Sequence, residues 1–521
     1  MKNSAEARRI EDLPEEFNGA VDLIEPNLAG GRAAKTAIVD RNGATSYAAL
    51  ADRIARMAGV FDRLGVVREQ RVLLCLLDTV DFPTVFLGAI RAGVVPVPLN
   101  TLLVAEDYRW ILENSRAAAV FVSHELSYHW TEIAKDFSHV RFVSSGDGPW
   151  EPLEEMIASG NPAALAADTH RDDIAFWLYT SGSTGRPKGA MHSHGSMRLT
   201  ANLFGIGVVG FREDDVVLSV AKQFFAYGLG NSLSFVYAAG ATAILFDGRA
   251  TPDAISSLIK THGVSVLCGV PTFFAGWFAS GATPTRDEAP RLRIATSAGE
   301  CLPAHLGEAF RERFGGDIID GLGSTEMLHV YLAQSPGSVR YGCTGKAVPG
   351  YELRIVDEGG REVASGELGE LQVRGPTVAL GYWRNRPKSR ATFQGEWMRT
   401  GDKYSCDADG WYSYGGRSDD MLKVGGIYVS PIEVEEALVC HSSVLEVAVV
   451  GAPDADGLIK PRAHVVVRPG EQAGDELEAE LKAHVKSMLA PYKYPRWIVF
   501  ADELPKTATG KIQRYRLRET A

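Results

Sequence analysis

The sequence lacks most of the features that would place it outside the class of ordinary globular enzymes. Only six cysteines occur among 521 residues, and none forms the closely spaced pair of a zinc or redox motif. No apolar run reaches the ~20 residues that span a bilayer, and the charged N-terminal stretch lacks the apolar region of a secretory signal. We therefore expect reduced thiols, no membrane segment and a cytoplasmic location.

Positive charge is also in short supply. Lys and Arg total 54 against 65 Asp and Glu, which gives a formal net charge of −11. Such a surface attracts nucleic acid and anionic membranes poorly, so a polyanionic ligand must be held by local basic groups. Hydrophobic residues make up 45% of the chain and charged residues 23%, which indicates a folded protein rather than disorder.

Helical and strand-like patterns alternate up to about Gly350. The apolar spacing of Tyr47–Leu64 predicts a helix, and residues 71–77 form a compact run typical of a buried strand. Thr251 and Pro252 provide the N-cap and first position of another helix. This alternation predicts mostly parallel sheets flanked by helices.

The pattern changes toward the C-terminus. Short strands and turns follow Gly350, and a small α/β unit follows the glycine pair at residues 415–416. The predicted fold class is therefore α/β, with mixed, mostly parallel sheets and a β-rich subdomain in a large N-terminal body. We place this body at residues 1–418 and a small mobile C-terminal α/β domain at residues 419–521.

The strongest chemical signal is the stretch 179–189, which follows a strand-like run at residues 174–179. Its glycines let the backbone curl so that N–H groups point inward, as a polyphosphate requires. A solvated surface turn is the alternative, but the preceding strand and the lysine favour phosphate binding. Pro187 stands where a P-loop has its second glycine, which argues against that motif. The predicted phosphate-binding residues are Thr180, Ser181, Ser183, Thr184 and Lys188.

This stretch resembles the phosphate-binding signature of the adenylate-forming superfamily, which contains acyl-CoA synthetases, peptide-synthetase adenylation domains and luciferases. Four further segments resemble motifs of the superfamily in the same order, at residues 321–326, 399–402, 415–420 and 505–511. Five short matches in one order rarely coincide by chance. The resemblance implies ATP and Mg²⁺, an acyl-adenylate intermediate and a C-terminal cap that rotates between two half-reactions.

The resemblance also implies roles for single residues. Glu326 would hold Mg²⁺ together with Thr184, and Thr325 would contact the α-phosphate. Lys511 would stabilise the charge that develops when a carboxylate attacks the α-phosphorus. Alternatively, Lys511 is one more exposed cation beside Arg514, Arg516 and Arg518, which we interpret as a solvated helix face. The implied nucleotide-binding residues also include Gly299, Glu300, Cys301, Asp320 and Gly321 near the adenine, and Asp402 and Arg417 near the ribose.

The same resemblance places a hinge at Asp419, where a loop residue would absorb the backbone rotation of the cap. Lys423, Gly425 and Gly426 would then line a channel for the pantetheine arm of coenzyme A. A plain glycine turn before the helix that begins at Pro431 is an equally compatible interpretation of these residues.

Residues 221–231 are most similar to the benzoate–CoA ligase branch, with Phe225 at a gate position where relatives often carry His. Glycines and aromatics would form a flat slot that suits a ring. Plain core aromatics and a satisfied buried histidine are the alternative. Gln223, Thr180 and the bulky pair at residues 273–274 depart from the pattern. The implied acyl-pocket residues are Phe225, Ala226, Tyr227, Gly228, Gly323 and His329.

His192 and His194 are interpreted as solvated rather than as a metal pair, because no further ligands accompany them. The sequence thus predicts an ATP-dependent ligase that joins an aromatic acid, benzoate first, to coenzyme A. Hydroxy-, amino- or halobenzoate, and transfer to a carrier protein instead of coenzyme A, remain alternatives. A binding protein without catalysis is disfavoured by the complete set of catalytic residue types. No nucleic-acid or membrane partner is expected, and a homodimer and acetylation of Lys511 are open hypotheses.

Overall fold

A computed structural model describes residues 4–182, 185–418, 420–424, 427–454, 459–489, 493–506 and 512–519 of the chain. The chain forms two compact units, Met1–Leu353 with Val373–Met398 and Arg354–Gln372 with Arg399–Ala521. The domain boundary between residues 418 and 419 stays a prediction. Within the described ranges, no helix is both long enough and apolar enough to cross a membrane.

The N-terminal part of the larger unit contains a five-stranded sheet in the order β4-β3-β5-β6-β7, and every neighbouring pair is parallel. Its strands are β3 (Arg71–Cys75), β4 (Val95–Pro98), β5 (Ala119–Ser123), β6 (Arg141–Ser145) and β7 (Glu151–Pro152). The predicted parallel arrangement is confirmed here. The helix pattern of Tyr47–Leu64 is confirmed as α2, whose first turn is capped by Ser46, the side chain of which accepts a hydrogen bond from the Ala49 N–H.

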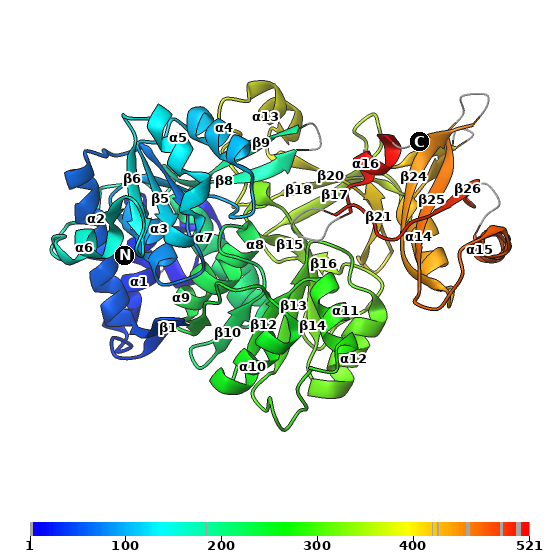
Figure 1. The fold of residues 1–521 in the computed structure, drawn as a ribbon, viewed down its shortest axis with the longest axis horizontal. Helices are drawn as coiled ribbons and strands as arrows, with labels where there is room; N and C mark the ends of the chain where they lie inside the picture. Colours follow the sequence, from blue (N-terminus) through cyan, green and yellow to red (C-terminus); the bar gives the residue numbers. More distant parts are fainter. Residues whose placement is uncertain are drawn as a thin grey trace. The chain divides into compact units, whose positions relative to one another are not determined.

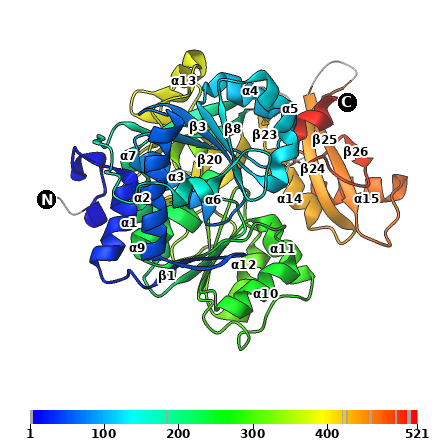
Figure 2. The same ribbon diagram turned by 60° about the vertical axis from the view of Figure 1, so that its left-hand side comes forward.

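Helix α2 packs against α3 (Asp81–Arg91), and the two lie side by side in Figure 2. Gly88 of α3 faces Met57 of α2, and a Cβ at position 88 would lie only 2.7 Å from the Met57 Cβ. The glycine therefore sets how closely the two helices approach.

A second sheet has nine strands in the order β16-β15-β14-β13-β12-β10-β11-β1-β2. The strands from β1 through β11, β10, β12 and β13 to β14 pair in parallel, whereas β2, β15 and β16 add antiparallel edges. The bounds are β1 (Thr36–Asp40), β2 (Gly43–Ser46), β10 (Val216–Ser219), β11 (Thr242–Ile244), β12 (Val266–Gly269), β13 (Ile294–Ala298), β14 (Ile318–Gly323), β15 (Val330–Ala333) and β16 (Lys346–Ala347). Parallel strands bring their carboxyl ends to one edge, and this edge carries the candidate site.

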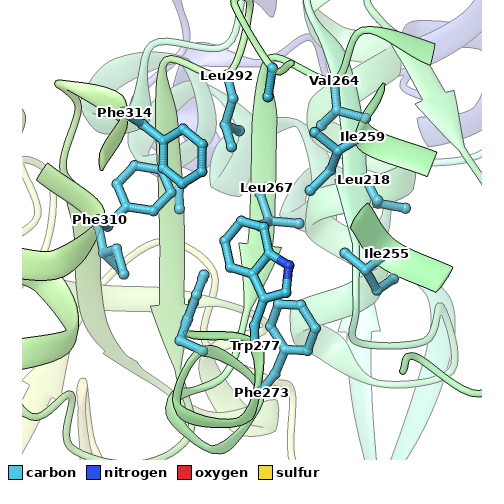
Figure 3. Packing of buried hydrophobic residues seen from close by; sticks show 14 of the residues in the cluster. Leu218, Ile255, Ile259, Val264, Leu267, Phe273, Trp277, Leu292, Phe310 and Phe314 are labelled. Carbon is cyan, nitrogen blue, oxygen red and sulfur yellow. The ribbon is translucent and has the colours of Figure 1, made fainter. Parts of the chain in front are cut away.

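Helices α10 (Pro252–His262), α11 (Pro271–Ala279) and α12 (Ala304–Phe314) cover this sheet and enclose an aromatic core (Figure 3). Trp277 lies at its centre, and its indole N–H donates to Ser256 Oγ at 2.8 Å. The bulky pair Phe273 and Phe274 is buried in the same cluster, so these rings belong to the core. The predicted N-cap is also confirmed, because the Thr251 side chain accepts from the Ala254 N–H.

The smaller unit contains a second α/β assembly. Strand β24 pairs antiparallel with β25, which pairs in parallel with β26. Apolar residues of this sheet and its helices, including Val434, Val449 and Leu481, form a separate core. Figure 1 shows these elements in orange and red: α14 (Pro431–Val439), β24 (Val444–Pro453), β25 (Ile459–Val467), α15 (Asp475–Met488), β26 (Trp497–Phe500) and α16 (Arg514–Glu519).

The β-rich region after Gly350 is confirmed by short strands. They are β17 (Glu352–Val356), β18 (Gly369–Arg374), β19 (Phe393–Gln394), β20 (Trp397–Cys406), β21 (Tyr412–Arg417), β22 (Leu422–Val424) and β23 (Ile427–Val429). Together with the parallel sheets and the C-terminal assembly, they confirm the predicted α/β class.

Several other elements go beyond the predicted pattern, although β8 (Ile174–Gly182) confirms the strand-like run at residues 174–179. Residues 144–173 contain the helix α6 (Leu153–Ala158) as well as turns, and Ala201–Val209 forms a π-helical stretch. The remaining elements are α1 (Gly19–Ala29), α4 (Ala105–Ser115), α5 (Thr131–Asp136), β8 (Ile174–Gly182), β9 (Gly185–Ser193), α7 (His194–Thr200), α8 (Ala226–Leu229), α9 (Phe235–Ala239) and α13 (Arg386–Thr392).

Candidate active site

The predicted phosphate-binding stretch is an antiparallel hairpin of β8 and β9. Thr180 pairs with Lys188, and Gly182 pairs with Gly185. The expected curled loop is therefore wrong for residues 180–182 and 185–188, which continue the backbone ladder after Tyr179. This arrangement places Lys188 opposite Thr180 on a rigid ladder, which limits how the two can move relative to each other.

Aromatic packing anchors the base of this hairpin. Trp177 lies 4.6 Å from Trp383 between ring centroids, and the Tyr179 hydroxyl donates to Asn114 Oδ1 at 2.7 Å. Both contacts reach parts of the chain distant in sequence. The hairpin that carries Lys188 is thus fixed from two sides.

The predicted adenine-binding residues lie on neighbouring parallel strands. Ser297 pairs with Asp320, so residues 299–301 leave the sheet beside Gly321. Gly299 adopts φ 96°, a left-handed conformation that favours glycine at the turn out of β13. Cys301 is exposed, and Glu300 accepts a hydrogen bond from the Thr272 hydroxyl at 2.9 Å.

Asp320 is buried within this edge. Burial raises the pKa of its carboxyl group to about 7, although hydrogen bonds from Ser297 and from backbone N–H groups oppose the shift. Near neutral pH the group therefore exists in both protonation states, so it can accept or donate a hydrogen bond.

The end of β14 carries the predicted metal-binding residue. Thr325 and Glu326 lie in a short helical turn capped by Ser324, whose side chain accepts from the Met327 N–H. The half-buried Glu326 carboxylate accepts a hydrogen bond from the Tyr382 hydroxyl, with 2.6 Å from that oxygen to Glu326 Oε1. A carboxylate held in one orientation is a suitable oxygen ligand for Mg²⁺.

The predicted acyl-pocket residues of the larger unit come together around two rings. Tyr227 and His329 stack with 5.3 Å between ring centroids, and His329 Nε2 lies 3.2 Å from the Tyr227 carbonyl oxygen. The Tyr227 hydroxyl shares a hydrogen bond with Thr296 Oγ1 at 2.7 Å. Burial lowers the pKa of His329 to about 3, so its ring is neutral at physiological pH.

Glycines let the backbone approach these rings. A Cβ at Gly228 would lie 2.0 Å from the Lys222 carbonyl oxygen, and one at Gly323 would lie 2.7 Å from the His329 carbonyl oxygen. Phe225 and Ala226 lie at the start of helix α8, which also contains Tyr227 and Gly228, and both are half-buried. Tyr227, His329 and these two glycines thus form one wall of the predicted acyl pocket. Its close backbone contacts leave no room for larger residues at the glycines.

The interpretation of His192 and His194 as solvated residues is wrong. Both are buried; His192 stacks on Phe176 at 5.2 Å, and His194 Nδ1 accepts from the Gly19 N–H at 3.1 Å. Burial lowers the pKa of His192 to about 3 and that of His194 to about 4. No metal-ligating cluster occurs among the residues that the structure describes.

Gln223, which departs from the expected apolar residue, is also fully buried. Its backbone N–H donates to the carboxylate of Asp78 at 3.2 Å. Burial raises the pKa of Asp78 to about 6, with Lys222 opposing the shift.

In the smaller unit, Asp402 and Arg417 are cross-strand partners on β20 and β21. Arg417 Nη1 donates to Oδ1 of the buried Asp402 at 3.1 Å. A Cβ at Gly401 would lie 2.8 Å from Arg417 Nη2, so the glycine makes room for the guanidinium group. The predicted pairing of an acceptor and a cation is present.

Several predicted residues lie outside the described ranges. They are Ser183, Thr184, Asp419, Gly425, Gly426 and Lys511. Ser181 lies in β8 and Lys423 in β22. The hinge, the pantetheine channel and the catalytic lysine therefore remain predictions from the resemblance.

The interpretation of the C-terminal arginines as a solvated helix face is wrong for Arg514, whereas Arg516 and Arg518 are exposed. Arg514 forms an ion pair with Glu435 at 2.7 Å, with side-chain exposures of 19% and 12%, and Arg518 pairs with Asp420. Burial raises the pKa of Glu435, and the charge of Arg514 opposes that shift. The helix that carries these arginines is thus fastened to its own unit by charge.

Two residues near the site were missed by sequence reasoning. Tyr382 contacts Glu326, and Thr296 contacts Tyr227. Tyr382 follows Gly381 in an aromatic pair with Trp383, which is the signal that would have drawn attention to it. Thr296 lies inside a buried strand, where its sequence carries no such signal.

Two family models match the chain. Residues 27–383 match the AMP-binding enzyme family, and residues 433–511 match the AMP-binding enzyme C-terminal domain.

Curated relatives match along nearly the whole length. A benzoate–CoA ligase of Thauera aromatica is 51% identical over 509 residues, covering 97% of this chain and 96% of the relative. A 4-hydroxybenzoate–CoA/benzoate–CoA ligase of Rhodopseudomonas palustris is 49% identical over 508 residues, covering 97% and 94%. The solved structure of a benzoate CoA ligase from Burkholderia xenovorans LB400 is 50% identical with a TM-score of 0.90, covering 96% of this chain and all of that one. The chain therefore belongs to the AMP-binding enzyme family.

Proposed function

We propose that the protein is an AMP-forming aryl-acid–CoA ligase and that benzoate is its preferred acid. The main support is the 51% identity to a benzoate–CoA ligase over 97% of the chain. The uncharged wall of Tyr227, His329 and two glycines is consistent with this proposal, because a neutral, flat surface suits an unsubstituted ring.

The first half-reaction is acyl-adenylate formation. A carboxylate oxygen of the acid attacks the α-phosphorus of ATP, and the bond between the α-phosphorus and pyrophosphate breaks. Both reactants are anions, so cations must stabilise the charge that develops between them. Lys188 on the hairpin is one candidate, and Lys511 is the other by family resemblance. Thr180, Ser181, Ser183, Thr184 and Thr325 would contact the phosphates as donors.

Mg²⁺ fits this site because the Glu326 carboxylate offers a hard oxygen ligand that is held in place by a hydrogen bond. Glu326 would hold the ion, with Thr184 assigned beside it by resemblance. When bound, the ion neutralises phosphate charge as pyrophosphate departs.

Nucleotide recognition would use residues of several predicted motifs. Asp402 would accept hydrogen bonds from the ribose hydroxyls, with Arg417 fixing its carboxylate. Residues 299–301 would line the adenine through their backbone. Asp320 would accept a hydrogen bond from the adenine amino group. This requires a carboxyl oxygen of Asp320 that carries no proton to face the base.

The second half-reaction is thioester formation. The thiol sulfur of coenzyme A attacks the acyl carbonyl carbon, the bond to the AMP oxygen breaks, and the thiol proton is released to solvent. Rotation at Asp419 would exchange the catalytic faces between the two steps, and Lys423, Gly425 and Gly426 would line the pantetheine channel. These roles rest on the resemblance.

A second candidate acid is 4-hydroxybenzoate. A relative that is 49% identical over 508 residues is named for both 4-hydroxybenzoate and benzoate. Selectivity between these two acids therefore needs measurement.

The test is a substrate panel of benzoate, its hydroxy, amino and fluoro derivatives, cyclohexanecarboxylate and hexanoate, with AMP and acyl-CoA both followed. Benzoate should give both products with the highest kcat/KM, and Lys511→Ala should abolish AMP formation. AMP without thioester would instead point to transfer to a carrier protein. No product from any ring acid would reject the proposed pocket.

Three further hypotheses concern the state of the protein. Acetylation of Lys511 would remove the cation of the first step, so fully active acetylated enzyme would reject that idea. A homodimer would be detected by sedimentation analysis. A cytoplasmic location would be tested by fractionating cells that express the chain.

A further inference from the structure

Residues 379–383 form a strap between the two segments that would hold ATP phosphates and metal. On one side, main-chain hydrogen bonds tie this strap to the phosphate hairpin. They run from the Leu380 N–H to the Met191 carbonyl, from the Met191 N–H to the Gly381 carbonyl and from the Trp383 N–H to the Gly189 carbonyl. On the other side, the Ala379 N–H donates to the Glu326 carbonyl oxygen at 2.7 Å. The strap therefore links the backbone of Lys188's hairpin to that of Glu326.

The side chain of Tyr382 also connects Glu326 and Lys188. Its hydroxyl donates to Glu326 Oε1 at 2.6 Å, and the Lys188 ammonium nitrogen lies 5.6 Å from the centre of its ring. The residue is only 5% exposed, its ring packs on Phe393 at 5.4 Å, and its N–H donates to Ser389 Oγ at 2.9 Å. Its position is thus fixed by packing and by backbone contacts.

The phenol acts as a hydrogen-bond donor. Its oxygen lies 2.6 Å from Glu326 Oε1. An ionised carboxylate can only accept hydrogen bonds, so the phenol is the donor in this contact.

We propose that Tyr382 is a positioning residue for the metal-binding carboxylate. Its hydroxyl donates to Oε1 of Glu326, which leaves the second carboxylate oxygen to bind a divalent cation. Its ring packs against the Lys188 ammonium group. This inference rests on the proposed function, because it takes Glu326 as the Mg²⁺ ligand. Removal of such a supporting hydrogen bond lowers metal affinity by about 10- to 100-fold in metal sites generally.

The competing interpretation is that Tyr382 is simply a buried structural tyrosine. The chain offers a matched control in Tyr351, which is also 5% exposed and whose hydroxyl lies 2.8 Å from Thr377 Oγ1. Thr377 in turn donates to the Met327 carbonyl oxygen. Tyr351→Phe therefore removes a comparable hydrogen bond near the same turn without touching Glu326.

The experiment measures ATP binding by calorimetry with Mg²⁺ present and with Mg²⁺ chelated. We divide the dissociation constant measured without Mg²⁺ by the one measured with Mg²⁺. This ratio reports metal-linked binding independently of turnover. Tyr382→Phe should lower this ratio about tenfold. Tyr351→Phe should leave this ratio unchanged, and Glu326→Gln should remove most of the effect of Mg²⁺ on ATP binding.

Each other outcome is decisive. An unchanged or increased ratio in Tyr382→Phe overturns the inference, and so does an equal loss in Tyr351→Phe, because the effect would then be structural. If Glu326→Gln leaves the ratio intact, the metal assignment in the proposed function is wrong, whatever the tyrosine does. If Glu326→Gln lowers the ratio and Tyr382→Phe does not, only the inference about Tyr382 fails.

A second variant covers the case in which Tyr382→Phe does not fold. Ser389→Ala removes the oxygen that accepts the Tyr382 N–H and loosens the tyrosine without changing its side chain. The metal-linked ratio should again fall, by less than in Tyr382→Phe. A folded Ser389→Ala protein with an unchanged ratio would count against the inference.

Discussion

The predicted acyl-pocket wall and the smaller unit are held together by different forces. Around Tyr227 and His329 the contacts are uncharged: stacked rings, one hydrogen bond to Thr296, and glycines that admit the backbone. In the smaller unit, by contrast, Arg514 forms a largely buried ion pair with Glu435, and Arg417 donates to Asp402.

The difference predicts how each region fails. An uncharged, close-packed wall is sensitive to volume, because a methyl group without space forces the backbone to shift. An ion pair away from water is sensitive to the loss of one partner, because the other charge is left without compensation. Substitutions that change volume or charge alone can therefore separate the two regions.

The largest effect is expected from Gly228→Ala in the wall. The added methyl carbon would lie 2.0 Å from the Lys222 carbonyl oxygen, so the backbone beside Tyr227 must move. Thioester formation should fall about 100-fold, and the free energy of unfolding should fall by about 3 kcal/mol. Acyl-CoA assays and urea unfolding measure the two quantities.

The control is Gly276→Ala, since a Cβ at that exposed helical position meets nothing within 4 Å. It should stabilise the protein by about 0.5–1 kcal/mol and leave activity unchanged. Equal behaviour of the two alanine variants would show that close packing does not govern the wall.

A smaller effect, confined to stability, is expected from Arg514→Met. The substitution keeps much of the aliphatic volume but leaves the Glu435 carboxylate without its cation. The free energy of unfolding should fall by about 3 kcal/mol. Arg361→Met serves as control, because its pair with Asp357 is exposed (86% and 36%) and its loss should change stability by less than about 0.5 kcal/mol. Similar losses in both variants would contradict the assigned role of burial.

The last effect, which is the smallest per pH unit, concerns the buried carboxyl group of Asp320. Burial raises its pKa from 3.8 to about 7, so the folded state binds more protons than the unfolded state between these values. Its favourable contribution is present below pH 4 and is lost as the pH rises toward 7. The stability of the protein relative to Asp320→Asn should thus fall across this window by at most about 1.4 kcal/mol per pH unit. Urea unfolding of both proteins between pH 5 and 8 tests this; a constant difference would reject the raised pKa.

The sequence predicted the regular parts of the fold because local signals and tertiary packing agree there. Tyr47–Leu64 has helical apolar spacing, a serine cap and a terminal glycine, and it forms the predicted helix. The hairpin of β8 and β9 was missed because its glycines also suit a loop, and only backbone pairing distinguishes the two. His192, His194 and Arg514 were placed in solvent because the segments around them are polar, whereas long-range contacts bury them.

The candidate site shows the same limit. Motifs identified Lys188, Glu326 and Asp402, whose chemistry is visible in the residue type. They did not identify Tyr382, because a tyrosine is equally suited to a core, and its contact with Glu326 joins residues 56 positions apart in the chain.

The pairing of Thr180 with Lys188 has a consequence for how this segment can vary in length. Side chains alternate between the two faces of a strand, so one residue inserted between Gly185 and Lys188 would turn the lysine away from the Tyr382 ring. Two inserted residues would restore the face but move the lysine along the strand by about 7 Å. Natural variants of this enzyme should therefore accumulate substitutions in β9 while its residue count stays constant.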